Sequence, residues 1–548
     1  MVAINISAFG GMSEKLSPRL LPDTMSEYAE NIDFSHGTMR GLISDASVTL
    51  NTGVNFNSIS GSNTESLFKT KAGIWLAFDN DVDVIESPVA GDIHDRVYLT
   101  GNLGYPQITS TLALNNVYKL GLPRPSAPNV TLNPPTSGNV ATETPISRAY
   151  LITHVTTFGE ESAPSLVTTS GIVDVYTDQT VTIVVGATPS GRPYSSIRVY
   201  RTDDDGVFRF LVQKSSSGET FTDTSPDSSL GEEVPSTDWI APNEAMIGLT
   251  AMPNGITAGF FDNTLCFSEA YLPHAWPEAY QLTTAYPIVG LSATDTGLIV
   301  LTEGKPYIVQ GADPAGMVMN ELDIAQSCLS KKSIVDMGGS VIYSSPDGLV
   351  GISQSGSKVL TEQIFTKAQW DDYAPSTVRG FRLEDRYVGF SDRSSGNPVG
   401  FILDPRGGQN SFCTVNQSLN YVAGFNDLET DALYLVRSNS TVVNFTGDTG
   451  YSSAQFYSKH FFTKRPINFG VCQVAFGEDL GGGTTTVKLY GGEKSPTGLI
   501  HTQTIPASET VATFRLPSGS RYSIFQVQVT SSREVANIIM AESPREIT

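Results

Sequence analysis

Cysteine is scarce in this sequence of 548 residues, and its spacing excludes two kinds of stabilisation. A disulfide-stapled small domain and a cysteine-rich metal site both need closely spaced cysteines. Here the four cysteines lie 62, 85 and 59 residues apart, without a CxxC pair: Cys266, Cys328, Cys413 and Cys472. The sequence therefore predicts buried free thiols in a protein made in a reducing cytoplasm.

The sequence also lacks a long apolar run. The opening MVAINISAFGGMSEK has no basic segment followed by an apolar one, which a standard secretory signal requires. No uncharged apolar stretch reaches the roughly 20 residues that a helix needs to cross a bilayer. We therefore expect neither standard secretion nor membrane insertion of the isolated protein.

Positive charge is in deficit. The chain has 34 Lys plus Arg against 56 Asp plus Glu, so its formal net charge is −22 and its pI is about 4.6. A protein that grips DNA shows the opposite balance, because neutralised phosphates supply most non-specific affinity. The acidity indicates either an ordinary solvated surface or a surface that repels nearby nucleic acid.

Motifs for catalysis are missing. The run GISQSG around Ser353 does not have the GxSxG spacing of a hydrolase nucleophile. The six histidines occur singly, without HxH or HExxH, and so give zinc no support: His36, His94, His154, His274, His460 and His501. We predict no catalytic residue, no cofactor and no metal ligand.

Close pairs of acids are the remaining candidates for catalysis. Neighbours on a strand point to opposite faces, so adjacent carboxylates are not expected to flank one glycosidic bond. We extend this expectation to four pairs: Asp81 with Asp83, Glu160 with Glu161, Glu232 with Glu233, and Asp371 with Asp372. Only pairing over long sequence distances could build a glycosidase site.

Two loops contain residue types that some ligand sites use. Asp203, Asp204 and Asp205 precede Gly206 between two strand-like runs, which favours a hairpin turn over a calcium loop. The triplet Gly481-Gly482-Gly483 is followed by no helix, so it predicts a hairpin loop rather than a phosphate cradle.

Glycine and proline are plentiful, with 50 and 31 residues, and Ser, Thr and Val are common, which favours an all-β protein.

Residues 1–45 are expected to form an arm with a short helix from Thr24 to about Asn31, followed by a hairpin that turns at Ser35-His36-Gly37. A proline-rich linker, GLPRPSAPNVTLNPPTSG, begins at residue 121. Residues 121–243 are expected to form an inserted immunoglobulin- or fibronectin-like β-sandwich, and residues 456–548 a C-terminal β-sandwich.

A repeat occupies residues 244–455. Val289, Val335, Val378 and Val422 recur at intervals of 46, 43 and 44 residues, each followed by short strand-like runs. A period of about 40 to 50 residues with three or four strands is typical of a β-propeller blade. With the strand-like runs of residues 46–120 as first blades, we expect a propeller of about six blades.

Two stretches could be read as sites. FSEAYLPHAWPEAY holds His274, Trp276 and Pro277, and it predicts either a structural corner or a ligand site. The corner interpretation places Trp276 in the core with its indole N–H bonded and His274 bonded to nearby backbone. Pro346, Asp347 and Gly348 approach a sialidase Asp-box but lack its spacing, so they indicate a hairpin turn.

Several of these runs carry a resemblance. FSEAYLPHAWPEAY, YPIVGL, VLTEGKPYIVQG, KKSIVDMGG and YSSPDGLVGIS resemble a family of tailed-phage virion proteins. The opening FGGMSEKLSPRLLPDTMSEYAENIDFSHGTMRG and the run DVDVIESPVAGDIHDRVYLTGNLGYPQIT resemble the same group, so the likeness covers about two thirds of the chain. The layout is similar to the nozzle or tail hub proteins of short-tailed phages, which include the tail tubular protein B and packaged-DNA stabilisation families.

The resemblance implies a structural virion protein of the bacteriophage tail. Members of that class are propellers with added β-domains, and six copies form a ring beneath the adaptor, the head-to-tail connector, and the portal. Genomic double-stranded DNA would be retained by this channel and would cross it at ejection without sequence-specific binding. Tail fibres, spikes or a plug would be further partners. The protein would be made in the host bacterial cytoplasm, and the family supplies no catalytic residue.

Two other functions remain open. One is a glycan-binding or glycan-degrading tail protein on a propeller scaffold, because fibronectin-like insertions often serve adhesion. The other is a host surface propeller unrelated to phage, against which the missing signal peptide and the few cysteines count.

Overall fold

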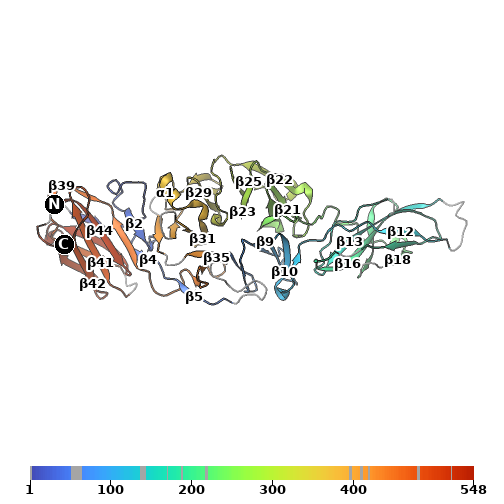
Figure 1. Ribbon diagram of the computed structural model, residues 1–548, viewed down its shortest axis with the longest axis horizontal. Helices are drawn as coiled ribbons and strands as arrows, with labels where there is room; N and C mark the ends of the chain where they lie inside the picture. Colours follow the sequence, from blue (N-terminus) through green and yellow to red (C-terminus); the bar gives the residue numbers. More distant parts are fainter. Residues whose placement is uncertain are drawn as a thin grey trace.

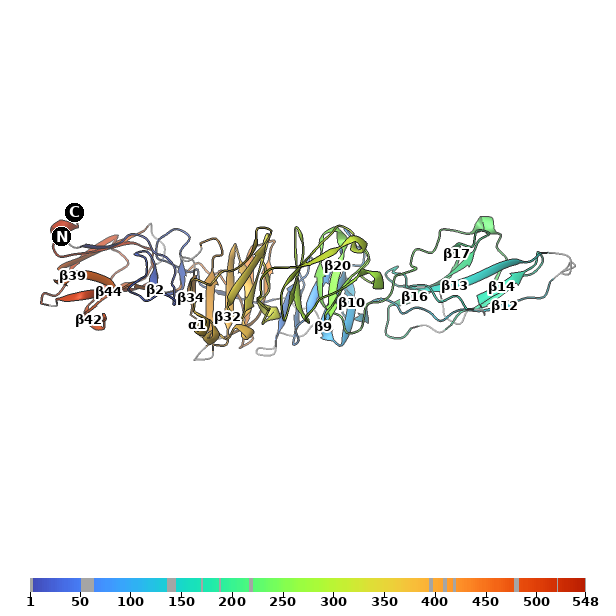
Figure 2. The same ribbon diagram turned by 90° about the horizontal axis from the view of Figure 1, so that it is seen from above.

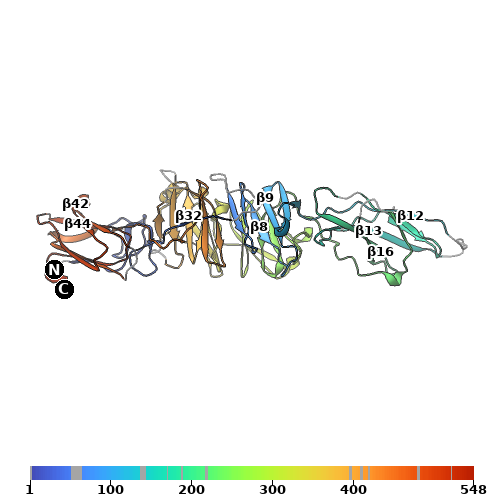
Figure 3. The same ribbon diagram turned by 90° about the horizontal axis from the view of Figure 1, so that it is seen from below.

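The computed structural model shows a long molecule made of three β-rich parts in line (Figure 1, Figure 2 and Figure 3). Both chain ends lie at one end, beside the C-terminal sandwich, and the inserted sandwich lies at the other end. The structure describes residues 3–50, 64–135, 144–168, 171–186, 189–215, 220–393, 398–407, 412–416, 420–477, 482–519 and 521–547.

The central part is a β-propeller. Six sets of four antiparallel strands and one two-stranded sheet follow each other in the described residues. In chain order they are β6 (Ser66–Lys69) and β7 (Trp75–Phe78); β8 (Asp83–Glu86), β9 (Arg96–Leu103), β10 (Tyr105–Ser110) and β11 (Tyr118–Lys119); β19 (Ile247–Ala251), β20 (Thr257–Phe261), β21 (Thr264–Phe267) and β22 (Gln281–Thr283); β23 (Ile288–Thr294), β24 (Gly297–Thr302), β25 (Tyr307–Gln310) and β26 (Val318–Glu321); β27 (Val335–Asp336), β28 (Ser340–Ser345), β29 (Gly348–Ser353) and β30 (Gly356–Val359); β31 (Arg379–Leu383), β32 (Arg386–Ser391), β33 (Val399–Leu403) and β34 (Phe412–Val415); and β35 (Tyr421–Asp427), β36 (Ala432–Arg437) and β37 (Val442–Asn444) with β5 (Ala46–Val48).

The first strands of these sheets form the inner wall of the ring. Each first strand contacts the first strand of the next sheet, in the order β8, β19, β23, β27, β31, β35 and β6. The ring closes where Leu76 and Phe78 of β7 pack on Val97 and Leu99 of β9. Apolar clusters fill the spaces between neighbouring sheets, because one blade cannot bury both of its own faces.

The repeat found in the sequence marks the inner strands. Val289, Val335 and Val422 lie in β23, β27 and β35, and Val378 directly precedes β31. Alternate residues of each inner strand face the neighbouring blade, which explains the apolar residue at a fixed position. The propeller fold predicted from this period is therefore confirmed.

The N-terminal residues join the propeller to the C-terminal sandwich. The helix predicted from Thr24 to Asn31 is wrong, because Ser26–Glu30 forms strand β2. β2 pairs with β34 on one side and with β38 (Ala454–Ser458) on the other, and this pairing outweighs the local capping-box spacing. The hairpin is confirmed, since β3 (Ile32–Asp33) pairs with β4 (Arg40–Gly41).

The C-terminal sandwich has two sheets. One contains β1 (Ala3–Ile6), β45 (Val535–Ala541), β40 (Val471–Phe476) and β43 (Val511–Arg515). The other continues the sheet of β31–β34 through β2 and β38 to β44 (Tyr522–Ser531), β41 (Thr485–Gly492) and β42 (Gly498–Ile505), while β39 (Phe461–Ile467) also pairs with β44. Their facing residues, such as Val474 and Val527, belong to the same large core as the last blades.

The inserted part is also a β-sandwich. β12 (Asn129–Leu132), β15 (Val181–Val184) and β18 (Thr220–Asp223) form one sheet; β14 (Ile172–Val175), β13 (Ile146–Thr156), β16 (Tyr194–Thr202) and β17 (Phe208–Lys214) form the other. The strand order differs from that of an immunoglobulin constant domain, because the last strand, β18, joins the sheet of the first, β12.

Helices are short. In the described residues the one α-helix is α1 (Lys367–Asp372), which begins at a Thr366 capping box and buries Trp370. The 3-10 helices are η2 (Thr111–Ala113), η4 (Asp227–Ser229), η5 (Pro253–Gly255), η6 (Glu278–Tyr280), η7 (Pro314–Gly316), η8 (Lys331–Ser333), η9 (Pro375–Thr377) and η11 (Pro544–Glu546). Within the described part of the chain, no helix has the length and apolarity to span a membrane.

The cysteines match the sequence-based prediction. All four are free and buried, and burial raises the pKa of each thiol to about 12: Cys266, Cys328, Cys413 and Cys472. A thiol with such a pKa is a poor nucleophile at neutral pH.

Candidate functional site

The segment around His274 and Trp276 lies at the junction between the propeller and the inserted sandwich. Residues 271–277 form a turn rather than an extended strand, with Tyr271 in the left-handed region at φ 62°. Trp276 is 4% exposed and packs in the core between the β8–β11 and β19–β22 sheets. Its indole N–H donates to the Pro273 carbonyl at 2.8 Å, as the corner interpretation expects. Pro277 immediately precedes η6.

His274 differs from the expectation in its surroundings. Its ring packs edge-to-face against Trp239, with centroids 5.9 Å apart, and not beside Trp276 as an extended segment would place it. Among the described residues, neither ring nitrogen finds a hydrogen bond of ordinary geometry, and Glu160 Oε1 is 3.9 Å from Nδ1. Burial lowers the pKa of His274 below its ordinary value of 6.5, although Glu160 opposes this shift. His274 is therefore an uncharged ring at neutral pH.

A buried polar cluster surrounds this corner. Arg96 on β9 donates to Asp92 at 2.7 Å and to Glu160 at 2.9 Å, and Tyr98 also donates to Glu160 at 3.4 Å. Glu160 follows β13 of the inserted sandwich, so these bonds connect the two parts of the molecule. We call Asp92, Arg96, Tyr98, Glu160 and His274 the junction cluster. Arg96 pairs with both carboxylates of the cluster, and the His274 ring packs beside them, which fits a structural connection.

Glu160 and Glu161 diverge as predicted for neighbouring residues. Glu160 faces Arg96, whereas Glu161 accepts from Arg198, Tyr200 and Thr153 inside the inserted sandwich. The two carboxylates therefore cannot act on one bond.

The expectation is wrong for Asp81 and Asp83, which converge. These residues are two apart, and both carboxylates contact the Lys331 ammonium, at 3.2 Å and 2.8 Å. The Gly248 N–H also donates to Asp83 at 3.0 Å. Burial raises the pKa of Asp83 above its ordinary value of 3.8, while Lys331 opposes that rise. A lysine held between both acids makes an ion-pair network rather than a general acid and base.

This network borders a cavity on the inner side of the ring. The cavity has a volume of about 370 Å³ and is lined by Asp83, Thr250, Ser292 and Asp336 on the inner strands of successive blades and by Lys331 of η8. Gly248 and Gly290 also line it. Its volume suits one small polar molecule, and a DNA duplex cannot enter it.

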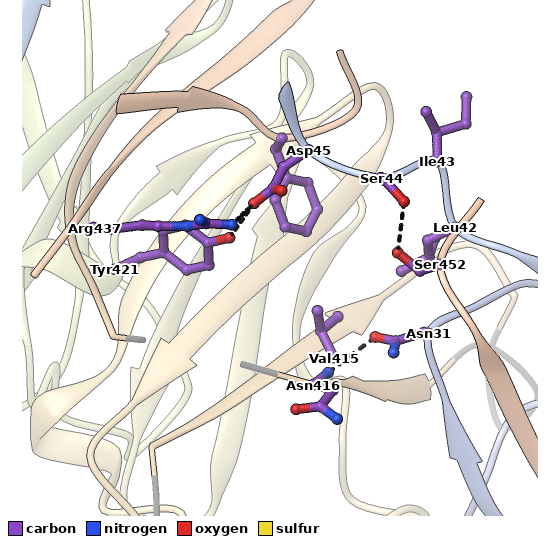
Figure 4. Close-up of a pocket in the computed structure, with 11 residues that line it drawn as sticks. Asn31, Leu42, Ile43, Ser44, Asp45, Val415, Asn416, Tyr421, Arg437 and Ser452 are labelled. Atoms are coloured by element: carbon purple, nitrogen blue, oxygen red, sulfur yellow. Dashed lines mark hydrogen bonds and ion pairs between the residues drawn. The ribbon is translucent and has the colours of Figure 1, made fainter. Parts of the chain in front are cut away.

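A second cavity, of about 160 Å³, lies where the N-terminal residues meet the last blades (Figure 4). Asp45 accepts from the Tyr421 hydroxyl at 2.9 Å and from the Arg437 guanidinium. The Asn416 N–H donates to the Asn31 amide oxygen at 2.9 Å. These polar groups bond to each other across segments remote in sequence, so they fasten the N-terminal residues to the propeller.

The remaining candidates are turns. Pro346 and Asp347 are the two loop residues between paired Ser345 and Gly348, as predicted, and Asp347 binds Lys367 at 2.9 Å. Asp203 caps the β16–β17 hairpin by accepting from the N–H groups of Asp205 and Val207. Ser353 lies in the β29–β30 hairpin. Gly481 lies outside the described residues. Across the described ranges, no group of three or more His, Cys, Asp and Glu could hold a metal ion.

The sequence missed most partners in these sites. Arg96 and Glu160 are 64 residues apart, and Lys331 and Asp83 are 248 apart. Neither pair has a local signal, since each forms only when distant strands pack together.

Comparisons with known proteins add little. No protein-family model and no curated protein matches the chain. Among solved structures, Hsv2 of Kluyvelomyces marxianus is 7% identical, with 52% of this chain and 90% of that chain covered and a TM-score of 0.27. The β-propeller domain of Cps50 (Swd1) from Myceliophteria thermophila is 9% identical, with 48% and 80% covered and a TM-score of 0.25. At these values, neither structure carries an argument about function.

Proposed function

We propose that this protein is a non-enzymatic virion component, a tail nozzle or hub whose copies form a channel for the genome. The observation that carries the proposal is the layout, a strongly acidic propeller with an added β-sandwich on each side. This layout is the one implied by the resemblance to short-tailed phage nozzle proteins. Six copies in a ring would stand below the adaptor, with fibres, spikes or a plug as neighbours.

Charge supports a conduit over a DNA-binding role. Six copies at −22 each carry a formal charge of −132, and acidic walls repel phosphates, so a duplex can slide without sticking. Each copy would be added to the tail after synthesis in the host cytoplasm.

The packing of the inner strands bears on where DNA can pass. Neighbouring inner strands contact one another, and the cavity of about 370 Å³ beside Asp83 and Lys331 is too small to admit a duplex. The channel of this proposal therefore lies between copies, with each propeller acting as a wall element.

The test is the assembly state. We expect mass photometry of the purified protein to show a hexamer, and electron cryo-microscopy of the virion to show a sixfold ring below the portal with a lumen wide enough for a duplex. A protein that stays monomeric at high concentration, or a trimer at the tail periphery, would overturn the proposal.

Glycan binding is a second candidate, and one surface favours it. On the outer face of the sheet, the Tyr28 and Tyr457 rings lie 5.1 Å apart, and the register places Tyr490 on the same face. Glu30 accepts from the Tyr28 hydroxyl at 2.5 Å and from the Gln455 amide at 3.0 Å. Tyrosine rings with fixed carboxylates and amides offer a stacking surface and polar partners. If the wild-type protein binds host polysaccharide and Tyr457→Ala does not, glycan binding is supported. If the wild-type protein does not bind host polysaccharide, this second candidate is excluded.

A further inference from the structure

Charge is unevenly distributed along the chain. Residues 456–548 contain nine Lys plus Arg and seven Asp plus Glu, for a net of +2. The remaining residues contain 25 Lys plus Arg and 49 Asp plus Glu, for a net of −24. The C-terminal sandwich is therefore the basic part of an acidic molecule, and opposite charges favour its contact with an acidic surface.

Two adjacent basic residues of this sandwich, Lys464 and Arg465, lie at a bulge in β39. Phe462 pairs with Ile524, and Ile467 pairs with Tyr522. Four residues of β39 therefore lie between two paired positions that are separated by one residue on β44. The four residues 463–466 therefore leave the ladder and project from the sheet edge, with Lys464 and Arg465 exposed. The Thr463 hydroxyl is bonded to the Arg465 carbonyl at 2.9 Å and the Ser523 carbonyl at 3.3 Å, which fixes the bend.

An exposed aromatic ring accompanies these cations. Phe462 is 50% exposed, and the Arg19 guanidinium lies 5.6 Å above its ring. Arg521 is exposed directly before Tyr522, at the same end of the sheet. We call Arg19, Phe462, Lys464, Arg465 and Arg521 the basic patch. Within the described residues, none of its four cations has an ion-pair partner, although the chain has 22 more acids than bases.

The propeller carries a surface of opposite character. The turn between β35 and β36 exposes Leu428 to 76%, with Glu429 and Asp431 exposed beside it. Asp427 fixes this turn, because it binds the Lys69 ammonium at 2.6 Å and accepts from the Glu429 N–H at 3.2 Å. We call Leu428, Glu429 and Asp431 the acidic turn. Among the described residues, neither acid of the turn forms an ion pair.

We propose that the basic patch of one copy docks on the acidic turn of a second copy. Within one copy they do not meet, because β39 lies at the end of the molecule and β35 in the propeller (Figure 1). Docking places Phe462 against Leu428 and the patch cations against Glu429 and Asp431, so both exposed apolar side chains and the charges gain partners. Both surfaces are held by hydrogen bonds, which lowers the entropy lost on contact. This inference rests on the proposed ring.

The test exchanges the charges. Lys464→Glu with Arg465→Glu, or Glu429→Lys with Asp431→Lys, should each raise the dissociation constant of the assembly by at least about 10-fold. An equimolar mixture of the two variants should restore assembly, because each basic surface then meets an acidic one. Mass photometry and sedimentation at low and at 0.5 M salt measure this, with stronger assembly expected at low salt.

Lys488→Glu is the matched control. It changes an exposed lysine of the same sandwich, on β41, and should leave assembly unchanged. Two outcomes would overturn the inference without touching the proposed ring. One is that each double variant assembles by itself as well as the wild type does. The other is that the mixture fails to assemble although circular dichroism shows both variants to be folded. A wild-type protein without any ring would instead overturn the proposed function.

Discussion

The two sandwiches are attached to the propeller in different ways. The C-terminal sandwich shares a hydrogen-bonded sheet with the last blades, because β2 pairs with both β34 and β38. The inserted sandwich is joined by side chains of the junction cluster and by two chain connections. Backbone pairing merges the C-terminal sandwich and the last blades of the propeller into one core, whereas the inserted sandwich has its own core. The two attachments should therefore fail differently.

Deleting β1 and β2 should have the largest effect. Removal of residues 1–31 leaves β34 and β38 with unpaired edges and takes Phe9, Met12 and Ala29 out of the large core. We expect no folded protein from this deletion, as measured by soluble yield and the near-ultraviolet circular dichroism spectrum. A folded product with an unchanged melting temperature would contradict the shared-core interpretation.

Removing the inserted sandwich is the paired experiment. A Cβ placed at Gly121 would lie 3.0 Å from the Ala241 side chain, so the two connections run side by side and a short Gly-Ser linker can replace residues 124–238. We expect the shortened chain to fold, with the propeller transition kept in calorimetry. Loss of that transition would show that the inserted sandwich is as integral as the C-terminal one.

Trp276→Ala should destabilise the propeller at the junction. The substitution removes a large side chain from the core between two sheets and should lower the free energy of unfolding by about 3 to 5 kcal/mol. Trp276→Phe keeps much of the apolar volume and should cost less. Chemical denaturation followed by circular dichroism measures both, and equal stability of Trp276→Ala and the wild type would refute the corner interpretation.

Arg96→Met should loosen the inserted sandwich specifically. It leaves Asp92 and Glu160 buried without their cation, at a cost of about 3 kcal/mol. Lys119→Met is the control, because its partner Glu244 is 65% exposed and such pairs contribute less than about 1 kcal/mol. Hydrogen exchange near Glu160 should rise in the first variant only. Equal exchange in both variants would mean that the cluster does not hold the junction.

The sequence predicts those parts of the fold whose signals are local. The blade period follows from Val289, Val335 and Val422, because each marks an inner strand of its own blade. β2 could not be predicted, since its partners Thr414 and Tyr457 lie 384 and 429 residues away from Glu30 and Tyr28, and local spacing favoured a helix. Similarly, the sequence singled out His274, but Glu160 and Trp239, which define its environment, come from other segments.

His274 should produce the smallest effect, a dependence of stability on pH. Because burial lowers its pKa in the folded protein, the unfolded chain alone takes up a proton as the pH falls from 6.5 towards that lowered pKa. The stabilisation that uncharged His274 gives the folded protein is therefore fully present above pH 6.5. As the pH falls below 6.5, the free energy of unfolding decreases by up to about 1.4 kcal/mol per pH unit. His274→Leu should flatten this slope in denaturation between pH 5 and 7.5. Identical slopes for wild type and His274→Leu would place the acid sensitivity elsewhere.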